Sequence, residues 1–158
     1  MPDDTRTLDD VLRGHRFAMV TTSTPRGLTA RPLTIMGQEG PVLRFLVSTE
    51  AEWVQELGNP LASVQVSLAA PDKDEFASLH GHASLDQSRE AVASIWNPGA
   101  TAFFDGPDDP NAAVLEATIV DGEWWDGPST KIGTAIAFVR KAVTGEEPGG
   151  HGRVDPGN

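Results

Sequence analysis

Apolar residues change their spacing along this chain, from a helical period to an alternating one. Thr7 and Asp10 have the spacing of a helix-capping pair, and the apolar residues that follow Thr7 predict a helix that ends at Gly14. Short alternating segments, separated by turns rich in glycine, proline and aspartate, then predict strands. These segments are residues 16–23, 28–36, 42–48, 61–70, 76–85, 113–120 and 123–126.

Turn signals and apolar stripes complete the predicted elements. Asp121-Gly122 predicts a tight hairpin turn between the last two strands. A short helix is expected at 50–57, and apolar stripes predict helices at 87–96 and 131–143. Six or seven strands with few helices favour a mainly β fold, built as a closed or partly closed antiparallel barrel with peripheral helices.

The chain length corresponds to one domain. Its 158 residues contain no repeat and no linker that would divide them, so we expect a single domain over residues 1–145. The core of that domain is expected over about 8–126, with the helix at about 131–143 packed on it. Glycine and proline are frequent after Gly145, which predicts a flexible tail over 146–158.

Composition excludes several classes of function. The net charge of −11 repels phosphate backbones and anionic membranes, so we expect no nucleic-acid partner and no membrane partner. The chain has no cysteine, which excludes disulfides and cysteine-based metal sites. Its acidic, polar start does not resemble a secretory signal, so a cytoplasmic location is expected. Phosphate-loop, dinucleotide-binding and nucleophile-elbow motifs are also missing from the sequence.

Arg31 is a cation in the middle of a strand that is otherwise largely apolar. Strand alternation places Thr29, Arg31 and Leu33 on one face and Pro32 on the other. Pro32 cannot donate a backbone hydrogen bond, which suggests an edge strand or a bulge there. A charge in this position is costly without a partner. The residue can therefore be an anion-binding group or an edge-strand arginine that faces water.

His80 and His82 lie two residues apart on a predicted strand and point to the same side. Two imidazoles at this spacing can share a metal ion, but a third ligand would have to come from elsewhere. A solvated polar face is the simpler interpretation, and we expect no metal site.

Several segments occur together in the order of a known family. They resemble the general-stress-protein branch of the pyridoxamine 5′-phosphate oxidase-like, flavin-binding split barrels, over most of the chain from about residue 8 to residue 126. The resemblance implies a six-stranded antiparallel split barrel, in most cases a homodimer with cofactor sites at the subunit interface. The segments are FAMVTTSTPRGLTARPLTI, FLVSTEAEWVQELGNP, LHGHASLDQ, IWN, FFDGPDDPNAAVLEATIV and EWWD.

The same resemblance implies a set of cofactor-binding residues. In similar proteins the strand around Arg31 lines the flavin, and the end of the third strand supplies backbone and hydroxyl contacts. The hydroxyls at that strand end can also cap the following helix. The residues implied by the resemblance are Arg31, Pro32, Leu33, Thr34, Val47, Ser48 and Thr49.

Trp53 departs from the family pattern. Many relatives have a lysine there that meets the cofactor phosphate, whereas an indole can stack on a ring or fill space but cannot neutralise a phosphate. We therefore include Trp53 in the candidate site and expect flavin mononucleotide (FMN), or another flavin or deazaflavin, to bind weakly.

The resemblance predicts a flavin- or deazaflavin-binding oxidoreductase, with a link to stress. The cofactor would carry the chemistry, so no catalytic side chain is predicted. Two alternatives remain: a flavin-binding stress protein without turnover, and a haem-binding relative. The haem alternative needs one of the four histidines, His15, His80, His82 or His151, as an axial ligand.

Overall fold

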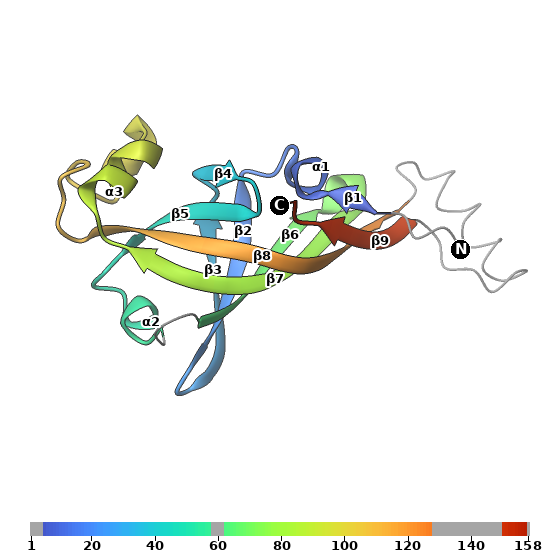
Figure 1. Cartoon of the computed structure of the whole chain (residues 1–158), viewed down its shortest axis with the longest axis horizontal. Helices are drawn as coiled ribbons and strands as arrows, with labels where there is room; N and C mark the ends of the chain where they lie inside the picture. The colour runs from blue at the N-terminus through green and yellow to red at the C-terminus, as the bar shows by residue number, and fades with distance from the viewer. Residues whose placement is uncertain (1–4, 58–61, 128–149, 158) are drawn as a thin grey trace, which may run out of the picture.

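A computed structural model describes residues 5–57, 62–127 and 150–157, and it is dominated by one large β-sheet (Figure 1). Three short α-helices accompany the sheet in these residues: α1 (Leu8–Leu12), α2 (Glu52–Gln55) and α3 (Arg89–Ile95). Two 3-10 turns, η1 (Pro71–Lys73) and η2 (Pro98–Ala102), follow β6 and α3. The strands are β1 (Arg6–Thr7), β2 (Phe17–Thr24), β3 (Gly27–Thr34), β4 (Gly37–Glu39), β5 (Val42–Ser48), β6 (Ala62–Ala70), β7 (Glu75–Asp86), β8 (Ala112–Asp126) and β9 (Gly150–Asp155).

The long strand β8 organises the sheet. It pairs with β7 along one edge, while its other edge is shared by β5 near its start and by β9 near its end. The main path runs β1-β9-β8-β7-β6-β2-β3, and β4 pairs with β5. The ladders are antiparallel except the one between β1 and β9, which is parallel.

The mainly β class is confirmed, but the sheet differs from the expected six-stranded antiparallel barrel. The described residues contain nine strands in a mixed sheet, because β1 and β9 add a parallel pair. Barrel closure is not seen, since within the described ranges no ladder joins β3 to β5. The expected edge position of Pro32 is confirmed, because β3 ends the main path.

The apolar faces of the strands meet in one main core. Alternate residues of β2 and β5 are buried there, and the opposite residues of both strands are at least partly exposed. The helix α3 forms a second cluster with β8, built from Val92, Ile95, Ala112 and Val114. The most deeply buried side chains of the main core are Val20, Leu43, Phe45, Val66, Leu79 and Leu115.

Side chains cap two of the three α-helices in the described residues, and the cap at Thr7 is the one that the sequence predicts. Thr7 caps α1, since its Oγ1 accepts a hydrogen bond of 3.2 Å from the Asp10 backbone N–H. Ser88 caps α3 in the same way through the Ala91 N–H. By contrast, α2 begins after Ala51 without a side-chain cap.

The predicted hairpin at Asp121-Gly122 is wrong. Residues 112–126 form one strand. It contains a bulge at Val120, which has no paired residue on β7, whereas Ile119 and Asp121 on either side of it are paired. Two close contacts explain why the strand continues through Gly122: a Cβ at Gly81 would lie 1.8 Å from the Thr118 carbonyl oxygen, and one at Gly122 would lie 2.7 Å from Leu79. The two glycines therefore allow β7 and β8 to lie close together, and Gly122 continues the strand instead of forming a hairpin turn.

The predicted flexible tail over 146–158 is also wrong for part of its length. Residues 150–155 form β9, and Val154 is buried in the main core. Gly150 packs beside Trp124, where a Cβ would lie 2.9 Å from the indole, so the glycine that suggested a tail is what allows the strand to fit. The helix predicted at 131–143 lies outside the described residues.

Within residues 5–57, 62–127 and 150–157, no helix has the length and apolar character needed to cross a membrane.

Candidate functional site

Arg31 points to the core side of β3 and is held there by neutral oxygen atoms. Its Nη1 donates to the Val20 carbonyl oxygen at 3.1 Å and to Thr22 Oγ1 at 2.8 Å. Its Nη2 donates to Thr29 Oγ1 at 2.6 Å. Antiparallel pairing places Val20 opposite Arg31 and Thr22 opposite Thr29, so the β2–β3 register creates this set of acceptors.

The Arg31 guanidinium lies over the Trp53 ring. The Cζ atom of Arg31 lies 4.2 Å from the centre of the Trp53 ring, which is within the range of a cation–π interaction. Trp53 belongs to α2, which follows β5, whereas Arg31 belongs to β3. The contact therefore joins β3 to the helix that follows β5. In the described part of the chain, no strand ladder joins β3 to β5.

The charge of Arg31 has no acidic partner. Among the residues that the structure describes, no carboxylate forms an ion pair with Arg31. Burial lowers the pKa of Arg31, because partial removal from water disfavours the charged form. A partly buried cation surrounded only by neutral acceptors is well suited to receive an oxyanion such as a phosphate.

The end of β5 lies next to α2 but contributes mainly to the fold. Val47 is buried in the main core. Ser48 Oγ accepts a hydrogen bond of 3.2 Å from the Glu50 N–H, and the Thr49 N–H donates to the Asn111 carbonyl oxygen at 2.9 Å. Neither hydroxyl caps α2 itself, so that expectation is wrong.

The predicted cofactor residues are divided between two faces of the sheet. Arg31 lies on the core side with Trp53, and Leu33 packs against the main core. Pro32 points to the opposite side, and Thr34 pairs with Phe17 across the β2–β3 ladder. The structure therefore brings Arg31 and Trp53 together and separates Pro32 from them.

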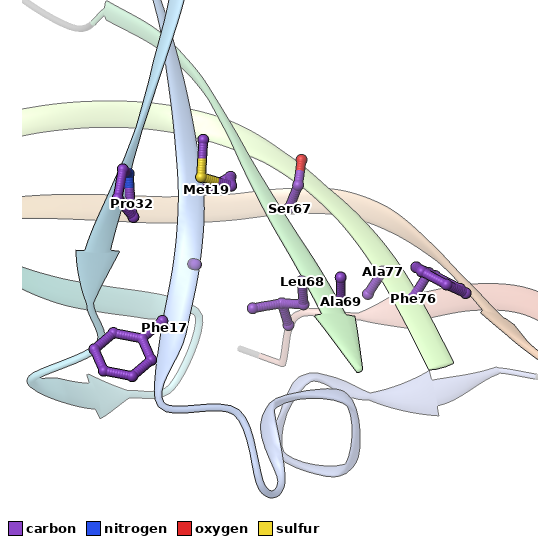
Figure 2. A pocket seen from close by; sticks show the side chains of 9 residues that line it. Phe17, Met19, Pro32, Ser67, Leu68, Ala69, Phe76 and Ala77 are labelled. Atoms are coloured by element: carbon purple, nitrogen blue, oxygen red, sulfur yellow. The ribbon is translucent and has the colours of Figure 1, made fainter. Parts of the chain in front are cut away.

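Pro32 lines a shallow groove on the outer face of the sheet (Figure 2). The groove has a volume of about 430 Å³, and none of its lining residues is charged. Phe17, Met19 and Phe76 expose 58%, 44% and 43% of their surface, which is unusual for large apolar side chains. The full lining is Phe17, Ala18, Met19, Pro32, Ser67, Leu68, Ala69, Phe76 and Ala77.

Sequence reasoning missed the two threonines that hold Arg31. Thr29 was placed on the face of Arg31 by alternation, but its hydrogen bond to the guanidinium was not predicted. Thr22 is buried and comes from the neighbouring strand. The only signal for Thr22 was the short turn between the two strands, which fixes their register.

The histidines give no metal centre in the described part of the chain. His80 and His82 are both exposed on β7, as the strand pattern predicts. No three histidine, cysteine, aspartate or glutamate side chains are grouped to hold a metal ion in residues 5–57, 62–127 and 150–157. His151 stacks on Trp125 instead, with ring centres 5.3 Å apart.

Comparisons with known proteins agree with this architecture. The family model described as pyridoxamine 5′-phosphate oxidase like matches residues 3–149. General stress protein 26 of Bacillus subtilis (strain 168) is 27% identical over 110 residues, which cover 68% of this chain and 77% of that protein.

Two solved structures are similar to this chain. A general stress protein 26 structure from Jannaschia sp. CCS1 has a TM-score of 0.69 at 21% identity, covering 92% of this chain and 93% of that one. The general stress FMN/FAD binding protein from Xanthomonas citri has a TM-score of 0.63 at 28% identity, covering 73% of this chain and 83% of that one. The first shows the shared fold, and the second is named for flavin binding.

Proposed function

Because the chain belongs to the pyridoxamine 5′-phosphate oxidase-like family, in its general stress protein 26 branch, we propose that it binds a flavin and acts as an oxidoreductase. FMN is the first candidate, since a relative from Xanthomonas citri is named as an FMN/FAD binding protein. A deazaflavin is the second candidate cofactor.

The uncompensated charge of Arg31 carries this proposal. Its hydrogen bonds go to neutral oxygen atoms, and no ion pair reaches it from the described residues. A phosphate would give this cation the opposite charge that the fold does not provide. The residues present therefore fit the phosphate end of a flavin nucleotide.

A bound flavin would supply hydride transfer, and the protein would bind and orient it. Arg31 would hold the phosphate, while Thr22 and Thr29 keep the guanidinium in place through their hydroxyl oxygens. Trp53 would cover one face of the guanidinium and keep water from it.

A flavin-binding stress protein without turnover is the second candidate function. The carboxyl groups with a displaced pKa, Asp10, Asp86 and Asp109, are each explained by hydrogen bonds in turns or at a helix start. None of those hydrogen bonds reaches Arg31, so the displaced pKa values point to no acid or base for catalysis beside it.

We extend the proposal to a homodimer. Six strands follow one antiparallel path, β3-β2-β6-β7-β8-β5, which is the strand set that a split barrel would use. The uncharged groove on the outer face, with Phe17, Met19 and Phe76 exposed, supports burial against another copy.

Replacement of Arg31 tests the proposed function. Arg31→Ala is expected to weaken FMN binding by roughly 1.5–3 kcal/mol, the scale of a charge-assisted hydrogen bond. That change corresponds to about one to two decades in Kd. Riboflavin has no phosphate, so its affinity should change little. Calorimetric titration of both ligands into both proteins gives the comparison.

Arg13→Ala is the matched control, because Arg13 is an exposed arginine whose ion pair is with Asp10 on α1. It should leave both affinities unchanged. Equal FMN affinity in wild type and Arg31→Ala would contradict the phosphate role of Arg31, and no binding of any flavin to wild type would contradict the proposed function itself.

A further inference from the structure

We propose that Trp53 is a positioning residue for Arg31, a role that rests on the proposed function of Arg31 as the phosphate-binding group. The indole stacks on the guanidinium and fixes its plane, so that the in-plane N–H groups stay aimed at a phosphate. This chain would thus use an aromatic face where relatives are expected to use a second charge.

The hydrogen bonds of Arg31 determine which donors remain for a ligand. A guanidinium carries five N–H donors in one plane. Val20 and Thr22 occupy Nη1, and Thr29 occupies one N–H of Nη2. The Nε–H and the other N–H of Nη2 have no acceptor among the described residues, and two such donors can hold a phosphate through two oxygens.

The stacking geometry leaves these donors open. The Arg31 Cζ atom lies over the Trp53 ring, 4.2 Å from the ring centre. In the proposed stack the ring covers a face of the guanidinium, whereas a ligand oxygen approaches the N–H groups along its edge, so the indole and the phosphate would not compete for the same positions. Stacking therefore restricts rotation of Arg31 without occupying its remaining donors.

The indole is itself held in place by α2. Val54 anchors this helix in the main core, with 5% of its surface exposed. Arg26, in the β2–β3 turn, forms an ion pair of 3.1 Å with Glu52 at the start of α2. Val54 thus holds α2 to the core, and the ion pair of Glu52 holds it to the β2–β3 hairpin that carries Arg31. Both contacts oppose movement of the indole away from the guanidinium.

The test compares two variants that differ in aromatic character. Trp53→Phe keeps a π-face for stacking, whereas Trp53→Leu keeps apolar volume but removes that face. Nitrogen-15 NMR of the arginine side chains in the unliganded protein measures rotation of the Arg31 guanidinium. Titration with FMN and riboflavin measures whether the phosphate is recognised.

We expect slow guanidinium rotation in wild type and Trp53→Phe, and fast rotation in Trp53→Leu. FMN affinity should fall about 3- to 30-fold in Trp53→Leu, the range expected from loss of a cation–π contact. Riboflavin affinity should change less than FMN affinity, and Trp53→Phe should restore most of the FMN affinity. Trp96→Leu, which removes another partly buried tryptophan packed near α3, is the control for general effects.

Two results would overturn the inference. One is equal mobility of Arg31 in wild type and Trp53→Leu, and the other is an equal loss of FMN and riboflavin affinity, which would give Trp53 a packing role only. Failure of the proposed function would look different: wild type would bind no flavin although Arg31 rotates slowly in wild type and quickly in Trp53→Leu.

Discussion

Arg89 and Asp109 together shape the loop that precedes β8. The Arg89 guanidinium donates to backbone carbonyl oxygens at the end of the loop and the start of β8, at 2.5 Å to Asp109 and at 2.7 Å to Ala112. The Asp109 carboxylate accepts hydrogen bonds from the backbone N–H groups of Asp105 and Asn111, at 3.0 and 2.9 Å. The loop is thus organised by side chains that bond to its own backbone.

Acid should loosen this loop at Asp109. The Asp105 N–H, followed by the Asn111 N–H, lowers the pKa of the Asp109 carboxyl below its ordinary value. A lowered pKa in the folded state gives stability that is present above the pKa of the unfolded state and is lost as pH falls through the folded value. We therefore expect the amide signals of residues 105 and 111 to shift together below about pH 4, measured by NMR titration.

Neighbouring Asp108 provides the control for this titration. Asp108→Asn should leave the shifts of residues 105 and 111 in place, while Asp109→Asn should abolish them. Persistence of the titration in Asp109→Asn would show that another carboxyl group causes it.

The Arg31 and Trp53 pair shows where prediction from sequence ends at the residue scale. Alternation along one strand placed Arg31 and Thr29 on a common face, because strand periodicity is local. Contact with Trp53 depends on where α2 lies relative to β3, more than twenty residues earlier in the chain. No local sequence pattern encodes where α2 lies in space relative to β3, so the contact between Arg31 and Trp53 could be found only in the folded structure.

At the scale of elements, the bulge between β7 and β8 fixes how closely these strands approach. His80 pairs with Asp121 and Gly81 with Ile119, which leaves Val120 as the extra residue. Gly81 is fully enclosed at this point, with the Thr118 carbonyl oxygen where a side chain would begin. The bulge therefore requires glycine because of the close approach of two backbones.

Gly81→Ala should be strongly destabilising. The added Cβ would lie 1.8 Å from the Thr118 oxygen, so the central ladder must separate. We expect the free energy of unfolding to fall by at least about 1–3 kcal/mol, the scale of overpacking in a core. Denaturant unfolding measures the change.

Gly106→Ala is the matched control, since nothing lies within 4 Å of the Cβ position there. Its stability should remain close to that of wild type. Similar stability of Gly81→Ala and Gly106→Ala would mean that β7 and β8 can separate at little cost.

The sequence predicted most strands and the cap of α1, because these depend on neighbouring residues. It failed at Asp121-Gly122 and at β9, for the same physical reason. In both places glycine was interpreted as a turn or tail residue, whereas the fold uses it to bring a backbone close to Leu79 or to Trp124. Local composition does not distinguish these two uses of glycine.

At the scale of the whole molecule, the outer face of the sheet predicts self-association. Phe17 and Phe76 are large exposed side chains on strands β2 and β7, and both line the uncharged groove. We expect the protein to sediment with about twice the mass of one chain at micromolar concentration. Phe17→Glu and Phe76→Glu should each shift it toward the monomer, because a carboxylate on this face opposes burial.

Phe103→Glu serves as the control for these variants. Phe103 is more exposed still, at 84%, but it follows η2 and does not line the groove. Its replacement should leave the mass unchanged. A monomeric wild type, or an equal effect of the three replacements, would contradict the outer face as the interface.

The parallel pair of β1 and β9 has a consequence for synthesis of the protein on the ribosome. Arg6 pairs with Val154 and also lies over the Trp124 ring, with Cζ 3.5 Å from its centre. This edge of the sheet cannot assemble until residues 150–155 have left the exit tunnel. We expect the nascent chain to present Trp124 uncovered until then, so that chaperones that hold exposed apolar segments would bind this edge before β9 is available to cover it.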